Sequence, residues 1–147
     1  MKTNHAFLIS IRPRFADMIF GGSKTVELRR VCPKVCAGDL ALVYVSSPAM
    51  ELRGSFEVGK IITASPSALW KRIGSKSGVT RAEFFAYFRG KKHAHAIVIK
   101  RAWKLDTSIC LTTLRQRKRG FRPPQNFHYL NRKGSSLLAS LVIPRDN

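Results

Sequence analysis

The stretch ELRGSFEVGKIITAS, at positions 51–65, has the composition of one long β-strand that is interrupted by Gly54 and Gly59. A glycine inside a strand marks a bulge or a sharp bend. A strand that bends in this way is typical of a sheet that curls toward a barrel. We therefore expect a curled sheet rather than a flat one.

Other short segments have strand character, and most of them are followed closely by proline or end in serine, as buried or half-buried strands do. These segments are 6–11, 24–31, 40–47 and 94–105. Between the first two, Pro13 suits a first helical turn and Gly21-Gly22 suits a helix end, so a helix is expected there.

Two more helices are predicted between the long strand and the strand that begins near residue 94. Ser65 followed by Pro66 is a helix start, and Thr80 with Glu83 three residues later forms a capping box. The capping role gives Glu83 a structural task. The fold class expected is α+β: a small closed or partly closed β-barrel of about five to six strands.

The length of 147 residues suits one domain, 1–147, without a linker. The basic segment 112–133 and the apolar segment 135–143 are expected to pack on its core. The apolar patch at the N-terminus is too short for a signal peptide, and no apolar run reaches the roughly 20 residues that span a bilayer. We therefore expect a cytoplasmic protein without a membrane partner.

The charge is extreme, since 27 Lys and Arg face 8 Asp and Glu for a formal net charge of +19. An anionic partner relieves the self-repulsion of such a chain, and nucleic acid adds counterion release to the binding free energy. Nucleic acid, with RNA foremost, is therefore the partner that the composition favours.

Seven of these cations and no acid lie in residues 112–133. The candidate backbone-binding residues there are Arg115, Arg117, Lys118, Arg119 and Arg122. Gln125 and Tyr129 follow, interleaved with Phe127, in a pattern that suits base stacking beside phosphate neutralisation. The alternatives are that the basic run is merely an exposed loop and that Phe127 packs the last strand onto the core.

The segment GGSKTVELRR, at 21–30, groups a lysine, a glutamate and two arginines directly after a glycine turn. Strand alternation places Glu27 and Arg29 on one face, while Lys24 can reach into a cleft beside the turn. A carboxylate accepts hydrogen bonds only, so it suits the exocyclic amine and ring N–H of a base. Arg29 then holds Glu27 in place or grips a phosphate. The alternative is an exposed cross-strand ion pair that contributes about 0.5 kcal/mol.

Four more residues are candidates for the same cleft. Arg12 ends the first strand, and Ser46 and Ser47 end a later one, where their hydroxyls can line the mouth of the cleft. The simpler reading of the two serines is a plain turn. Trp70 is expected in a helix core or as a cleft wall.

No metal site or cofactor is expected. Cys32 and Cys36 are separated by three residues, and no second cysteine pair completes a zinc site. Together with Cys110 they are expected to be reduced thiols. His93 and His95 share one strand face without an acidic ligand near them in sequence.

Four blocks resemble, in order, the ASCH domains of the PUA-like superfamily. They are LISIRPRFADMIFGGSKTVELRR, LVYVSSPAMELRGSFEVGKI, LWKRIGSKSGVTRAEFFAYFRGKKHAHAIVI and RPPQNFHYL, from about residue 7 to residue 130. The first block holds the family's strand with Ser-Ile-Lys/Arg-Pro, its helix and Gly-x-Lys-x-x-Glu-x-Arg. The resemblance implies a pseudobarrel with a cleft beside the first helix, in which family members bind RNA or modified nucleosides.

The resemblance also implies a catalytic alternative. Some small relatives are amidohydrolases of acylated cytidine that use a lysine after the glycine turn, a threonine three residues on and a separate glutamate. Lys24 matches the lysine, Glu27 stands at the threonine position, and KRIGSKSGVT, before the predicted helix at 80–90, contains no glutamate.

The first hypothesis is an RNA-binding PUA-like module that reads one unstacked base or modified nucleoside. The second is an enzyme in the same cleft, either an amidohydrolase or a ribonuclease. Lys24 would be its nucleophile or general base, with a pKa lowered by neighbouring arginines, and Glu27 its proton-transfer partner. The third is a basic component of a ribonucleoprotein assembly.

Overall fold

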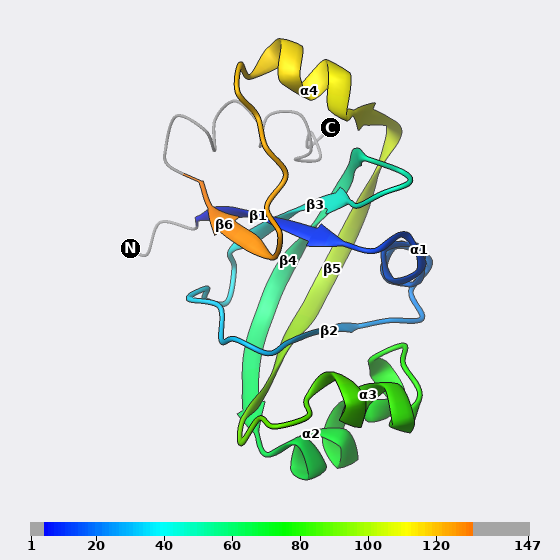
Figure 1. The fold of residues 1–147 in the computed structure, drawn as a ribbon, viewed down its shortest axis with the longest axis vertical. Helices are drawn as coiled ribbons and strands as arrows, with labels where there is room; N and C mark the ends of the chain where they lie inside the picture. The colour runs from blue at the N-terminus through cyan, green and yellow to red at the C-terminus, as the bar shows by residue number, and fades with distance from the viewer. Residues whose placement is uncertain (1–4, 131–147) are drawn as a thin grey trace.

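A computed structural model describes residues 5–130 of the chain. The predicted α+β class is confirmed, with a curled mixed sheet of six strands in the order β2-β5-β4-β3-β1-β6 over the described residues (Figure 1). The strands are β1 (Ala6–Ile11), β2 (Val26–Arg29), β3 (Leu40–Val45), β4 (Glu51–Ala64), β5 (Ala94–Cys110) and β6 (Phe127–Tyr129). The helices are α1 (Pro13–Gly21), α2 (Pro66–Ile73), α3 (Arg81–Tyr87) and α4 (Leu111–Arg117), with a 3₁₀ turn at Gly74–Lys76.

The two long strands β4 and β5 form an antiparallel ladder that carries the rest of the sheet. Its register shifts near Gly54 and Gly59, where the sequence predicts bends. A Cβ on Gly54 would collide with the carbonyl oxygen of Trp103, so only glycine fits there. The glycines therefore let the two strands approach closely and bend together.

The helix starts and stops follow the sequence signals. Pro13 begins α1 and Gly22, in the left-handed conformation, ends it. Thr80 and Glu83 form the reciprocal capping box at the start of α3. As predicted, α1 follows the first strand, and α2 and α3 lie between β4 and β5.

Alternate residues of β1 fill different parts of the core. Phe7, Ile9 and Ile11 pack with α1 and the inner side of the sheet. Leu8 packs instead with α4. A third cluster joins β2 to α2 and α3. The sheet is therefore covered on both sides.

Two features differ from the sequence expectation. β5 runs to Cys110 instead of ending near residue 105, and the first part of the basic segment is a helix, α4. Leu111 and Leu114 of α4 are three residues apart and both buried, so this helix is held by a short apolar stripe. The segment 135–143, predicted to pack on the core, lies outside the described residues.

In Figure 1, α4 lies at one end of the β4–β5 ladder and the α2–α3 pair at the other. β1 and β2 cross the space between these two ends. Residues of α3 at one end and of α4 at the other line the candidate site.

Candidate functional site

A cavity of about 910 Å³ opens between α3 on one side and α4 with the loop before β6 on the other. Its remaining walls come from the end of β1, the start of α1, β2 and the turn after β3. The cationic, acidic and aromatic side chains in its lining include Arg12, Phe15, Lys24, Glu27, Arg29 and Arg115.

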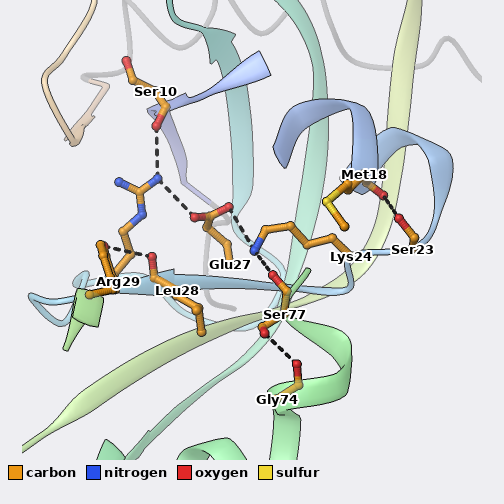
Figure 2. Close-up of polar contacts among 10 residues, drawn as sticks. Ser10, Met18, Ser23, Lys24, Glu27, Leu28, Arg29, Gly74 and Ser77 are labelled. Atoms are coloured by element: carbon orange, nitrogen blue, oxygen red, sulfur yellow. Dashed lines mark hydrogen bonds and ion pairs between the residues drawn. The ribbon is translucent and has the colours of Figure 1, made fainter. Parts of the chain in front are cut away.

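The turn after α1 directs Lys24 into this cavity. Gly22 reverses the chain at φ 89°, and the backbone N–H groups of Ser23 and Lys24 both donate to the carbonyl oxygen of Met18. The Lys24 side chain is only 2% exposed. Its Nζ donates to the carbonyl oxygen of Ser77 at 2.5 Å (Figure 2).

The Ser77 carbonyl is itself held in place. The Ser77 hydroxyl donates to the carbonyl oxygen of Gly74 at 2.6 Å. Gly78 follows at φ 74°, and a Cβ there would lie 2.9 Å from the terminal methyl of Met18 and 3.4 Å from Cδ of Lys24. Glycine at this position therefore allows the segment before α3 to approach the lysine.

β2 places Glu27 between two cations. The carboxylate Oε2 lies 4.0 Å from Nζ of Lys24, and Oε1 lies 3.6 Å from Nη2 of Arg29. Figure 2 shows the three side chains side by side, with the carboxylate in the middle. Glu27 is 7% exposed and Arg29 8%. The strand is therefore buried on both faces, not half-buried as predicted, because α2 and α3 cover the face of Val26 and Leu28.

This charged cluster has unused hydrogen-bonding capacity. Arg29 Nη2 donates to the carbonyl oxygen of Ser10 at 3.1 Å, and the hydroxyl of Tyr87 donates to the Leu28 carbonyl. Yet Glu27 Oε2 and Arg29 Nε have no hydrogen-bond partner within residues 5–130. One buried acceptor and one buried donor are thus left at a cavity wall, which is costly unless a ligand or water satisfies them.

Burial lowers the pKa of Lys24 below its ordinary value of 10.5. The Glu27 carboxylate opposes this shift, whereas Arg29 and Arg14 add to it. Burial is therefore the first cause of the shift that the sequence assigned to neighbouring arginines. A lowered pKa increases the fraction of neutral amine, which is the form of a lysine that can accept a proton.

A second carboxylate, Glu83 on α3, lines the cavity but is fully engaged. Arg14 donates to both of its oxygens, at 2.8 and 3.2 Å, and the backbone N–H of Thr80 donates at 3.1 Å. Arg14 and these Thr80 bonds lower the pKa of Glu83 from 4.5 to about 2. Glu83 is therefore an ionised structural group at neutral pH, and it ties α1 to α3.

The structure brings most of the predicted site residues to one cavity. Beside the Lys24, Glu27 and Arg29 cluster, its lining includes Arg12, Ser46, Ser47, Arg115 and Gln125. Arg117, Lys118, Arg119 and Arg122 lie outside the lining, in and after α4.

Two predicted aromatic residues lie elsewhere. Trp70 packs against Phe84 and Phe85 in the core between α2 and α3. The Tyr129 hydroxyl accepts a hydrogen bond from the backbone of Lys34. Phe127 packs against the core, as the alternative interpretation held.

Sequence reasoning missed part of the lining. Tyr44 lies in the predicted strand segment 40–47 and lines the cavity, and burial raises the pKa of its hydroxyl. The loop at 123–126 joins the site because the hydroxyl of Ser10 donates to the Pro124 carbonyl at 2.6 Å. Such a contact between residues 114 apart has no local sequence signal.

Within residues 5–130, no group of His, Cys, Asp and Glu could hold a metal ion. Cys32, Cys36 and Cys110 are exposed free thiols. The same described range has no helix with the length and hydropathy to cross a membrane.

The curled sheet and the cavity beside α1 define a protein of the PUA-like class. The sequence model of the ASCH domain family matches residues 9–106, so the chain belongs to this family. The resemblance seen in the sequence is thereby confirmed.

The relatives are consistent with this assignment. An ASCH domain-containing ribonuclease of Zymomonas mobilis is 28% identical over 135 residues, which are 92% of this chain and 90% of that protein. A crystal structure of ASCH from Zymomonas mobilis is similar with a TM-score of 0.86 at 28% identity, covering 93% of this chain and 95% of that one. A large ribosomal subunit protein of Ureaplasma parvum is 30% identical over 88% of this chain, which spans 40% of that protein.

Proposed function

We propose that this chain binds single-stranded RNA and seats one unstacked base in the cavity. The observation that carries the proposal is the buried Glu27 carboxylate at the cavity wall, with an oxygen that lacks a hydrogen-bond donor among the described residues. A buried acceptor without a donor costs free energy. The N–H groups of a base supply that donor.

The rim of the cavity supports the same function. Arg12 and Arg115 line it and are exposed, and Arg117, Arg119 and Arg122 continue the exposed positive surface beyond it. Cations in such an arrangement neutralise phosphates on either side of an inserted base. The ring of Phe15, with Lys24 Nζ 5.1 Å from its centroid, offers an aromatic wall inside.

Salt dependence tests RNA binding directly. The affinity for a labelled, unstructured RNA of about twelve nucleotides is measured by fluorescence anisotropy from low to high salt. We expect the logarithm of the association constant to fall by about 0.7 per phosphate contact for each unit of log salt. An affinity that hardly changes with salt contradicts the proposal.

RNA cleavage is a second candidate, because the Zymomonas relative that aligns over most of the chain is a ribonuclease. A neutral Lys24 amine would take the proton of a ribose 2′-hydroxyl. The 2′-oxygen would bond to the adjacent phosphorus, the P–O5′ bond would break, and O5′ would take a proton from water. The products are a 2′,3′-cyclic phosphate and a free 5′-hydroxyl.

End-labelled RNA, with a copy that carries one 2′-deoxy residue, tests this chemistry. Cleavage should stop at the deoxy position and should be lost in Lys24→Met, which replaces the amine by an unbranched apolar side chain one atom shorter. Unchanged cleavage by a folded Lys24→Met protein contradicts the assignment. Acylated cytidine, incubated in parallel, tests the amidohydrolase alternative, and co-sedimentation with ribosomes tests a role in a ribonucleoprotein assembly.

A further inference from the structure

We propose that the base seated in this cavity is guanine; the inference rests on the RNA-binding function proposed above. It starts from the order of the groups on the cavity wall. The Glu27 carboxylate lies between Arg29 Nη2 at 3.6 Å and Lys24 Nζ at 4.0 Å. The wall therefore presents an acceptor flanked by donors (Figure 2).

The atoms without a hydrogen-bond partner are also one acceptor and one donor. Glu27 Oε2 is a buried acceptor and Arg29 Nε a buried donor, and neither has a hydrogen-bond partner within residues 5–130. Both side chains are more than nine-tenths buried and line the cavity. A complementary ligand must bring N–H donors to the carboxylate and an acceptor to a neighbouring cation.

The Watson–Crick edge of guanine has this pattern. Its ring N1–H and exocyclic N2–H₂ are adjacent donors, which a carboxylate accepts through both oxygens. The neighbouring O6 is an acceptor that suits a guanidinium or ammonium group. Glu27 would take the two N–H groups, while Arg29 or Lys24 donates to O6.

The other bases fit less well. Adenine and cytosine place a ring nitrogen acceptor beside the exocyclic amine. The lone pair of that ring nitrogen would face the carboxylate and be repelled by it. Uracil has one ring N–H between two carbonyl oxygens, so one carbonyl opposes Glu27. A site built to bond particular N–H groups rejects analogues that lack them, because its own buried groups are left unpaired.

The cavity also has room for a purine. Its volume of about 910 Å³ lies within the usual range for small-molecule sites. Aromatic residues contribute to the lining, with Phe15 from α1 and with Phe84 and Tyr87 from α3. A planar base can therefore meet apolar surface while its edge meets the charged cluster.

The test uses one unstructured oligonucleotide with a single variable base at its centre. The base is guanine, hypoxanthine, 2-aminopurine, uracil, adenine or cytosine, and every nucleotide carries 2′-fluorine so that cleavage cannot distort binding. Anisotropy gives the affinity of the full chain for each. We expect guanine to bind roughly 5- to 150-fold more tightly than adenine or cytosine. Hypoxanthine, without the amine, and 2-aminopurine, without O6 and N1–H, should fall between.

Two variants locate the preference. Glu27→Gln should bring the six affinities close together, because an amide cannot accept two N–H groups. Arg117→Gln, in α4 outside the cavity, should weaken all six equally and keep the preference for guanine. If Glu27→Gln does not fold by circular dichroism, the hypoxanthine and 2-aminopurine comparisons on the unaltered protein decide.

The outcomes separate the two proposals. Equal, salt-dependent affinity for all six oligonucleotides overturns the guanine inference and leaves RNA binding standing. Tighter binding of adenine or cytosine overturns it as well. Absence of salt-dependent binding overturns RNA binding itself.

Discussion

The charged cluster of Lys24, Glu27 and Arg29 forms the floor of the cavity, and exposed arginines form its rim. The floor and the rim use the same cationic residue types in opposite ways. On the floor, Lys24 and Arg29 are buried around the single carboxylate of Glu27. On the rim and the surface that continues it, Arg115, Arg117, Arg119 and Arg122 are exposed and have no acid near them in sequence.

The contrast shows where selectivity and affinity arise. Buried charges interact strongly and depend on one another's presence, so their removal is costly and their geometry is fixed. Exposed cations interact weakly with the protein and remain free to neutralise phosphates. We therefore assign base selection to the floor and general RNA affinity to the rim, and four predictions test this division.

Removing the floor carboxylate should have the largest effect. Glu27→Leu leaves two buried cations without their counter-charge, so we expect a loss of about 3–5 kcal/mol in the free energy of unfolding. The rim control Arg117→Ala should change it by no more than about 0.5 kcal/mol. Urea unfolding measures both, and a loss below 1 kcal/mol for Glu27→Leu would contradict a mutually dependent floor.

The second largest effect is expected from a matched pair of glycine substitutions. Gly78 and Gly120 have nearly the same positive φ, 74° and 78°, but only a Cβ at Gly78 meets neighbours, Met18 and Lys24. Alanine at Gly120, near the rim, should cost about 1 kcal/mol for the backbone conformation alone. Alanine at Gly78 should cost more, by up to about 2 kcal/mol. Equal losses in thermal or urea unfolding would show that the floor tolerates displacement.

The salt dependence of RNA binding should separate floor from rim. In the proposed binding mode Arg117 contacts a phosphate, so Arg117→Gln should decrease the slope of log affinity against log salt by about 0.7. Glu27→Gln should leave this slope unchanged, because the proposal places a base and not a phosphate against the floor. An altered slope in Glu27→Gln would place phosphate contacts on the floor.

The smallest effect concerns the α3 wall. Glu83 has its pKa lowered from 4.5 to about 2, chiefly by Arg14, so the folded state favours the ionised form. The resulting stability is present above pH 4.5 and is lost as the pH falls toward 2. Glu83→Gln should therefore show a shallower loss of stability than the unaltered protein over this range. Parallel curves for the two proteins would exclude this contribution.

The sequence predicts the elements whose signals are local. Gly54 and Gly59 predict the bends of β4, and Thr80 with Glu83 predicts the start of α3. The helix α4 was not predicted, because its two leucines are embedded in a run whose charge dominates the pattern. The place of the segment 135–143 stays a prediction.

The site was predictable only in its local part. Strand alternation groups Glu27 with Arg29, and the glycine turn adds Lys24. The partner of Lys24, the Ser77 carbonyl, is 53 residues away in the chain, and burial of β2 on both faces depends on helices that follow much later. Non-local packing therefore makes this group a buried, incompletely satisfied charged cluster, and not the exposed ion pair of the alternative interpretation.

The most direct measurement of base insertion is an NMR titration that follows the Nε–H of Arg29 and the carboxyl carbon of Glu27. Adding a guanine-centred oligonucleotide should shift both signals saturably, and an adenine-centred one should shift them much less at equal concentration. Shifts confined to rim residues such as Arg115 and Arg117, with the signals of Arg29 and Glu27 unmoved, would contradict a base-selecting floor.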